Sequence, residues 1–171
     1  MDLESEILRE HSKQNMVRIA RWVGTDSARF KQLMELFLHG DYRTTQLAAW
    51  VVSYYCVEWH PQLARPWLKP MLKRMQEPGV HDAVKRSVLR ILQFVDIPRS
   101  LQGSVATVCF GYLQSPDTPI AVRVFSMTVL ARIAEQQPDL RNELKLVIQQ
   151  MLPYGGAAIR ARAKKVLKKL G

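Results

Sequence analysis

Apolar residues follow a helical period along nearly the whole chain. One stretch has Val84, Val88, Leu89, Ile91 and Leu92, a spacing that places all five on one face of an α-helix. No stretch shows the strict apolar and polar alternation of a half-buried strand. Breaks rich in Gly, Pro or Asp occur at 24–26, 40–41, 60–61, 78–79, 97–98, 115–117, 137–138 and 155–156. The pattern predicts an all-α fold of about nine helices joined by short loops.

Several of these helices are copies of one another. Similar nine-residue segments lie at 84–92, 122–130 and 159–167, at shifts of 38 and 37 residues, with a weaker copy at 45–53. A second apolar helix is predicted before each strong copy, at 63–75, 101–113 and 140–152. A repeat of this length indicates an array, and its unit is a pair of helices.

The strong copies share an opening pair of residues, Val84-Lys85, Val122-Arg123 and Ile159-Arg160, followed by a small residue or Val in mid-helix. This pattern resembles the HEAT repeat. The resemblance implies a right-handed α-α superhelix of the HEAT/armadillo-like solenoid type, in one domain over residues 1–171. Within it, residues 1–59 are expected to be an N-terminal cap and a divergent repeat, and residues 156–171 a C-terminal capping helix.

The whole chain is similar to small bacterial HEAT-repeat proteins of unassigned function. At the level of the fold it is also distantly similar to the HEAT-like alkylpurine DNA glycosylases. Those enzymes use a concave pocket of aromatic residues with an acidic side chain, and no residue of this chain can be matched to that pocket one by one.

Charge adds a preference for an anionic partner. The formal net charge is +10, and residues 86–171 carry 13 Lys and Arg against 5 Asp and Glu. No stretch approaches the roughly 20 apolar residues of a membrane span, and the acidic N-terminus lacks the features of a signal peptide. We therefore expect a cytoplasmic protein that does not enter a membrane.

Groupings that could catalyse a reaction are scarce. The histidines are dispersed and lack the spacing of a metal site: His11, His39, His60 and His81. Cys56 and Cys109 lie in apolar helical runs, so we expect two buried thiols. No metal, no cofactor and no catalytic residue is predicted, and a binding protein is favoured over an enzyme.

An aromatic cluster is the first candidate site. Trp50, Tyr54 and Trp59 fall close together, beside the acid Glu58. Such rings fill the core of helix pairs, which is the more frequent use. They can also stack on a base, so these three residues are a candidate aromatic pocket.

The basic residues of the repeat are the second candidate site. Lys85, Arg123 and Arg160 occupy equivalent positions and are expected to form a ladder on a concave surface. Neighbouring cations are the remaining candidates for anion or nucleic-acid binding: Arg86, Arg90 and Arg162. Two interpretations stay open, since such cations either neutralise phosphates or bridge adjacent turns of the repeat. The lysines of residues 164–169 are expected to form a solvated face.

The sequence thus favours a non-enzymatic binding or scaffold module with a basic concave groove. The expected partner is a protein segment or nucleic acid, and the residues do not decide between them or indicate an oligomeric state. The alternative is a DNA-alkylation-repair glycosylase with an aromatic base pocket.

Overall fold

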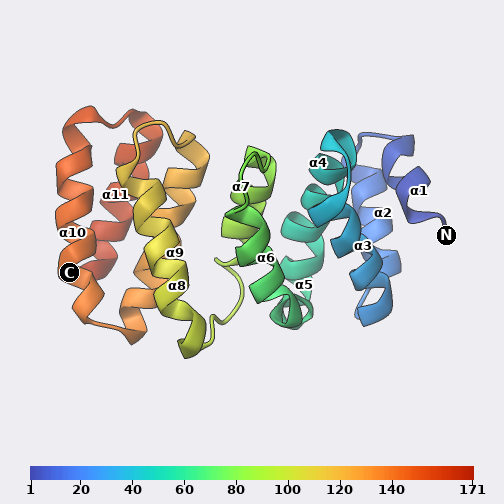
Figure 1. Ribbon diagram of the computed structural model, residues 1–171, viewed down its shortest axis with the longest axis horizontal. Coiled ribbons are helices and arrows are strands. Elements are labelled where there is room, and N and C mark those ends of the chain that lie inside the picture. Colours follow the sequence, from blue (N-terminus) through green and yellow to red (C-terminus); the bar gives the residue numbers. More distant parts are fainter. The chain divides into compact units, whose positions relative to one another are not determined.

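The computed structural model describes all 171 residues, and every regular element in it is helical (Figure 1). The predicted all-α fold is confirmed, while the handedness of the superhelix stays a prediction. The chain divides into two compact units, Met1–Asp96 and Ile97–Gly171. We describe each unit by itself.

The first unit contains seven α-helices and two segments of other helical type. The α-helices are α1 (Leu3–Arg9), α2 (Lys13–Val23), α3 (Ser27–His39), α4 (Tyr42–Val51), α5 (Val57–Trp59), α6 (Leu68–Met75) and α7 (Asp82–Ile91). A π-helical segment, η1 (Val52–Cys56), joins α4 to α5, and a 3₁₀ segment, η2 (Pro61–Trp67), leads into α6. Helix α4 packs against α3 and α7, so it lies at the centre of this unit.

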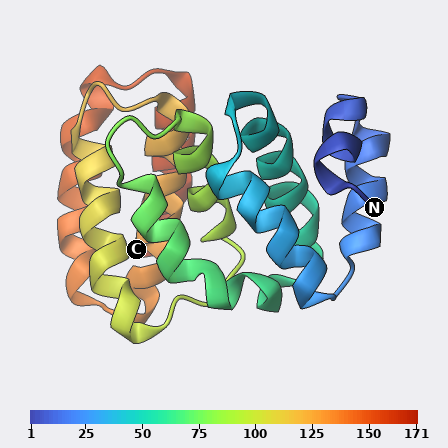
Figure 2. The same ribbon diagram turned by 45° about the vertical axis from the view of Figure 1, so that its right-hand side comes forward.

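The second unit contains four α-helices: α8 (Arg99–Gln114), α9 (Ile120–Gln136), α10 (Asp139–Met151) and α11 (Ala157–Leu170). A short 3₁₀ segment, η3 (Leu152–Tyr154), follows α10. Helix α9 packs against α8, α10 and α11, and Figures 1 and 2 show the four helices side by side. The predicted helix pairs 101–113 with 122–130 and 140–152 with 159–167 are therefore present.

The helix count exceeds the expected nine by one when contiguous segments are counted together. The additional break lies at residues 10–12, between α1 and α2, where the sequence has neither Gly nor Pro. Ser12 caps α2 there, because its side chain accepts a hydrogen bond from the backbone N–H of Asn15 at 3.1 Å.

Four polar residues near helix starts, Ser27, Asp41, Ser100 and Asp117, are of types that suit an N-cap, and one of them caps a helix. Asp41 caps α4 by accepting from the Thr44 N–H at 2.8 Å. Ser27 is not the cap of α3, since the Asp26 side chain accepts from the backbone N–H groups of Ala28 and Arg29. Ser100 and Asp117 are not caps either, because α8 and α9 each start directly after a proline.

The small residues of the repeat are buried, as close helix packing requires. Ala49, Val88, Ser126 and Ala163 are at most 2% exposed. The Ser126 hydroxyl donates to the Val122 carbonyl at 2.7 Å within its own helix, so its polar group is satisfied. None of the helices combines the length and apolar character that crossing a membrane requires.

Candidate functional site

The first unit holds a pocket between α4 and α7, which we call the Trp50 pocket. Its volume is about 320 Å³, and its lining residues are His11, Gln46, Leu47, Trp50, Tyr54, Arg86 and Ser87. Helix α4 and segment η1 supply one wall, α7 supplies the other, and the loop at residues 10–12 supplies His11. The sequence placed Trp50 and Tyr54 together, and the structure brings both into this pocket.

The rings of the Trp50 pocket are held by their neighbours. The His11 ring stands nearly perpendicular to Trp50, at 81° and 5.3 Å between centroids. Leu47 is 4% exposed, whereas Tyr54 is 45% exposed. The pocket thus combines a buried aliphatic side chain with aromatic surface that solvent reaches.

Arg90 is engaged within the first unit. Its guanidinium lies 3.7 Å from the centroid of the Tyr54 ring and 5.2 Å from that of Phe94. It also donates to Glu58 at 3.3 Å. Glu58, the acid expected beside an aromatic pocket, is therefore paired with Arg90. Glu58 does not line the Trp50 pocket.

Trp59 lies outside the pocket. It is 43% exposed, and its ring is 5.6 Å from that of Tyr55. Of the three predicted aromatic residues, the structure therefore brings two together and places the third elsewhere in the first unit.

Two neighbouring cations of α7 differ in their surroundings. The Lys85 Nζ lies 3.8 Å from a carboxylate oxygen of Asp82, the partner that its spacing in the sequence predicts. Arg86 is exposed, lines the Trp50 pocket and has no hydrogen-bond or ion-pair partner in the structure. Arg86 therefore presents an open positive charge at a pocket.

In the second unit, two predicted anion-binding residues contact the protein itself. The Arg123 Nε and Nη2 atoms lie 3.4 and 3.3 Å from the Leu113 carbonyl oxygen near the end of α8. Arg162 donates to the Thr128 hydroxyl of α9. Both contacts join a repeat helix to its neighbour, which is the structural use of a repeat arginine.

Helix α11 presents the densest group of free cations. Its buried face is apolar, with Ile159, Ala163, Val166 and Leu170. Its exposed cations without a partner are Arg160, Lys164, Lys165 and Lys168, which we call the α11 cations. Lys169 differs from them because it pairs with Glu135. No acidic residue lies anywhere in α11.

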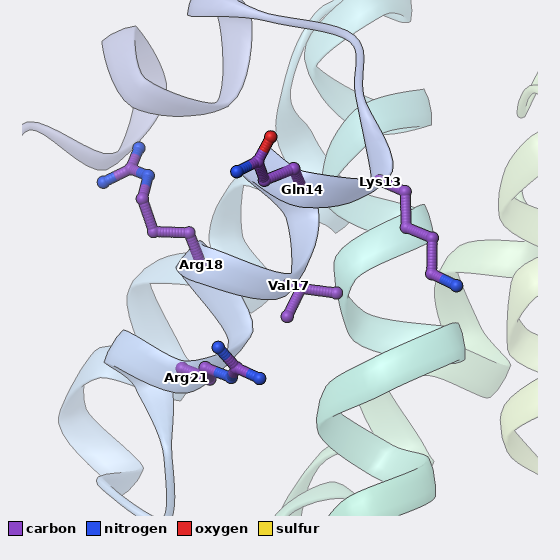
Figure 3. Close-up of a pocket in the computed structure, with 5 residues that line it drawn as sticks. All are labelled: Lys13, Gln14, Val17, Arg18 and Arg21. Atoms are coloured by element: carbon purple, nitrogen blue, oxygen red, sulfur yellow. The ribbon is translucent and has the colours of Figure 1, made fainter.

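Two other concavities have different linings. The larger, about 590 Å³, is formed by one face of α2, where Figure 3 shows Lys13 and Val17 projecting away from Arg18. Arg18 is engaged by Glu6 and by Asn15. The other, about 430 Å³, lies in the second unit beside Arg123 and Tyr154.

The two thiols are unsuited to nucleophilic chemistry. Burial raises the pKa of Cys56 to about 12, and burial likewise raises the pKa of Cys109 to about 12, where a bond with Ser126 opposes the effect. A thiol with such a pKa is protonated at neutral pH, so neither cysteine provides a thiolate. Both are buried, as expected.

The polar groups at helix starts are used as caps. Hydrogen bonds from the backbone N–H groups of Arg29 and Thr44 lower the pKa values of Asp26 and Asp41, respectively. The His81 Nδ1 accepts from the Ala83 N–H at 3.0 Å, as a cap of α7. No cluster of three or more His, Cys, Asp or Glu side chains is placed to hold a metal ion.

Several lining residues were not singled out in the sequence. Gln46 aligns with Lys85 in the weak repeat copy, so its position on the exposed face could have been found from the alignment. His11 has no such signal, because it enters the pocket from a loop some 40 residues before Trp50. Leu47 comes directly after Gln46 on α4, and Ser87 comes directly after Arg86 on α7.

Comparison with known families gives one result. A family model described as a HEAT repeat domain matches residues 3–170, almost the whole chain. No curated protein and no solved structure matches.

Proposed function

Because the chain belongs to the HEAT repeat family, whose repeats commonly serve as protein-interaction scaffolds, we propose that it is a non-enzymatic binding module for an anionic partner. The α11 cations form the binding surface, and an acidic protein segment is the favoured partner. The two unpaired thiols fit a cytoplasmic location, which is part of the proposal.

The single observation that carries the proposal is the stripe of free charge on α11. Arg160, Lys164 and Lys168 are four residues apart, so their side chains share one face and lie about 6 Å apart along the axis. Side chains on one face of an extended segment repeat every two residues, or about 6.7 Å. Alternate carboxylates of an extended acidic segment therefore match this stripe.

The rest of the predicted ladder supports the proposal only in part. Arg160 is open to solvent, whereas Arg123 is held by a backbone carbonyl and Lys85 lies beside Asp82. We therefore assign the partner to α11 and treat Arg123 as a structural residue. The anion-binding roles of Lys85, Arg86, Arg90 and Arg162 stay predictions.

The test compares two variants of equal charge. One replaces the α11 cations with Gln, at Arg160, Lys164, Lys165 and Lys168. The control makes the same change at four exposed cations of the first unit that have no partner: Lys31, Arg65, Lys69 and Lys73. Binding is measured by fluorescence anisotropy with a labelled twelve-residue peptide that has Glu at alternate positions, across a salt series.

We expect the α11 variant to bind the peptide about tenfold more weakly at low salt, since four favourable charge contacts are lost. The control variant should change affinity by less than about threefold, and added salt should weaken the wild-type protein most. Equal losses in both variants would show attraction by net charge alone and contradict the proposal. Tighter binding to a single-stranded or double-stranded oligonucleotide of equal charge would assign the surface to nucleic acid.

The glycosylase is a second candidate because the structure brings Trp50 and Tyr54 into one pocket with Arg86. Against it, Glu58 is bound to Arg90 and no acidic side chain lines the pocket. Release of alkylated purine from a methylated duplex, above a blank without protein, would establish this activity. A result at the level of the blank would reject it.

A further inference from the structure

The Trp50 pocket is a separate feature from the α11 cations, and its shape depends on the π-helical segment η1. The N–H of Val57 bonds to the Val52 carbonyl, five residues earlier, instead of the usual four. The Ser53 hydroxyl donates to the Ala49 carbonyl at 2.7 Å in the preceding turn. One extra residue per turn changes the direction of the side chains that follow, and Tyr54 lies within this turn. Such π segments are frequent at functional sites.

The size and walls of the Trp50 pocket suit a single ring. Its volume of about 320 Å³ is near the lower limit for ligand pockets, so it is too small for an extended ligand. Trp50 and Tyr54 offer aromatic surface, and Leu47 offers an aliphatic contact. A flat ring can therefore bury its area against aromatic and apolar side chains.

The positive charge at the pocket favours a ring that carries a negatively charged group. The Arg86 guanidinium lines the pocket and has no acidic partner. Arg90 adds a second positive charge behind Tyr54, partly compensated by Glu58. Since no carboxylate lines the pocket, the site favours an anionic group next to the ring.

Gln46 leaves one hydrogen-bond acceptor at the pocket for a peptide N–H group. Gln46 Nε2 donates to the Tyr42 hydroxyl at 3.2 Å, which leaves its carbonyl oxygen without a partner in the structure. That oxygen can accept a backbone N–H of a ligand. A ring, a carboxylate and an N–H donor occur together in an aromatic residue of an acidic peptide.

We propose that the Trp50 pocket binds an aromatic side chain of a protein partner, with an adjacent carboxylate on Arg86. This inference rests on the proposed function, because it specifies a second feature of the same acidic segment. Trp, Tyr and Arg are the residue types that contribute most to protein interfaces, and they surround this pocket.

The test uses small probes that separate the ring from the charge. N-acetylphenylalanine has both, N-acetylphenylalanine amide has only the ring, and acetate has only the charge. Each is titrated into the full chain while the indole N–H signal of Trp50 is followed by NMR, assigned with the Trp50→Phe variant. Adenosine monophosphate is the fourth probe, and it represents a nucleotide.

We expect N-acetylphenylalanine to bind with a dissociation constant on the order of 1 mM. The amide should bind about tenfold more weakly, because it lacks the charge-assisted hydrogen bonds to Arg86. Acetate should not move the Trp50 signal at the concentrations used. Arg86→Gln should make acid and amide bind alike, and Arg86 is exposed, so this variant is expected to fold.

The α11 variant described above is the control that separates the two proposals. It should bind N-acetylphenylalanine like the wild-type protein, even if its peptide affinity is lost or was never present. Equal binding of acid and amide to the wild-type protein, or no response to Arg86→Gln, would overturn the pocket assignment. Tighter binding of adenosine monophosphate than of N-acetylphenylalanine would overturn the peptide occupant in favour of a nucleotide.

Discussion

Equivalent basic residues of the repeat have different partners. Lys85, Arg123 and Arg160 occupy equivalent positions in the repeat. Lys85 lies near the carboxylate of Asp82, Arg123 contacts the Leu113 carbonyl at the end of α8, and Arg160 is exposed to solvent. The Lys85 contact could be predicted because Asp82 is on the same helix. The Arg123 contact could not, since it depends on where α8 ends in space.

A residue-scale prediction concerns the two thiols. Their pKa values of about 12 lie above the ordinary value of 9.0, so the folded state favours the protonated form. The associated stability is fully present below pH 9 and is lost as pH rises from 9 toward 12. At pH 8 we expect Cys56 and Cys109 to react with Ellman's reagent only after urea unfolds the protein. Rapid reaction of either thiol in the folded protein would contradict its burial.

At the scale of elements, breaks that contain Gly or Pro were predictable, and two departures were not. The break at residues 10–12 has no such residue and depends on the cap Ser12, yet it brings His11 to the Trp50 pocket. The π-helical turn of η1 has no recognised pattern in this sequence. Consequently an aromatic pocket at Trp50 and Tyr54 was predicted, while its shape and the contribution of His11 were not.

Two glycines at helix positions should respond oppositely to alanine. A Cβ on Gly103, within α8, meets no atom within 4 Å, so Gly103→Ala should stabilise the protein by about 0.5–1 kcal/mol through helix propensity. A Cβ on Gly40 would lie 2.5 Å from the Leu36 carbonyl oxygen. Gly40→Ala should therefore destabilise, because a backbone atom must shift. Urea unfolding measures both changes, and a gain in stability for Gly40→Ala would contradict the packing at the end of α3.

At the scale of the whole molecule, the repeat length was sufficient to predict the family, whereas the anionic partner inferred from charge stays a prediction. The all-helical fold follows from the apolar period, and the family match over residues 3–170 agrees with it. The distribution of charge was only partly predictable. Most of the excess is in residues 97–171, where 11 basic residues oppose 4 acidic ones, but the sequence alone did not show which of the basic residues lack a partner.

The measurement that tests the central claim most directly compares Arg123→Gln with Arg160→Gln, for both urea unfolding and binding of the acidic peptide. The claim is that α9 uses its repeat cation for structure and α11 uses its own for the partner. We expect Arg123→Gln to lower the free energy of unfolding by about 1 kcal/mol, because the Leu113 carbonyl loses its donor.

Arg160→Gln should leave the free energy of unfolding within about 0.5 kcal/mol of the wild-type value and weaken peptide binding about threefold. The opposite distribution, with Arg160→Gln destabilising the fold and Arg123→Gln alone weakening the peptide, would contradict the account.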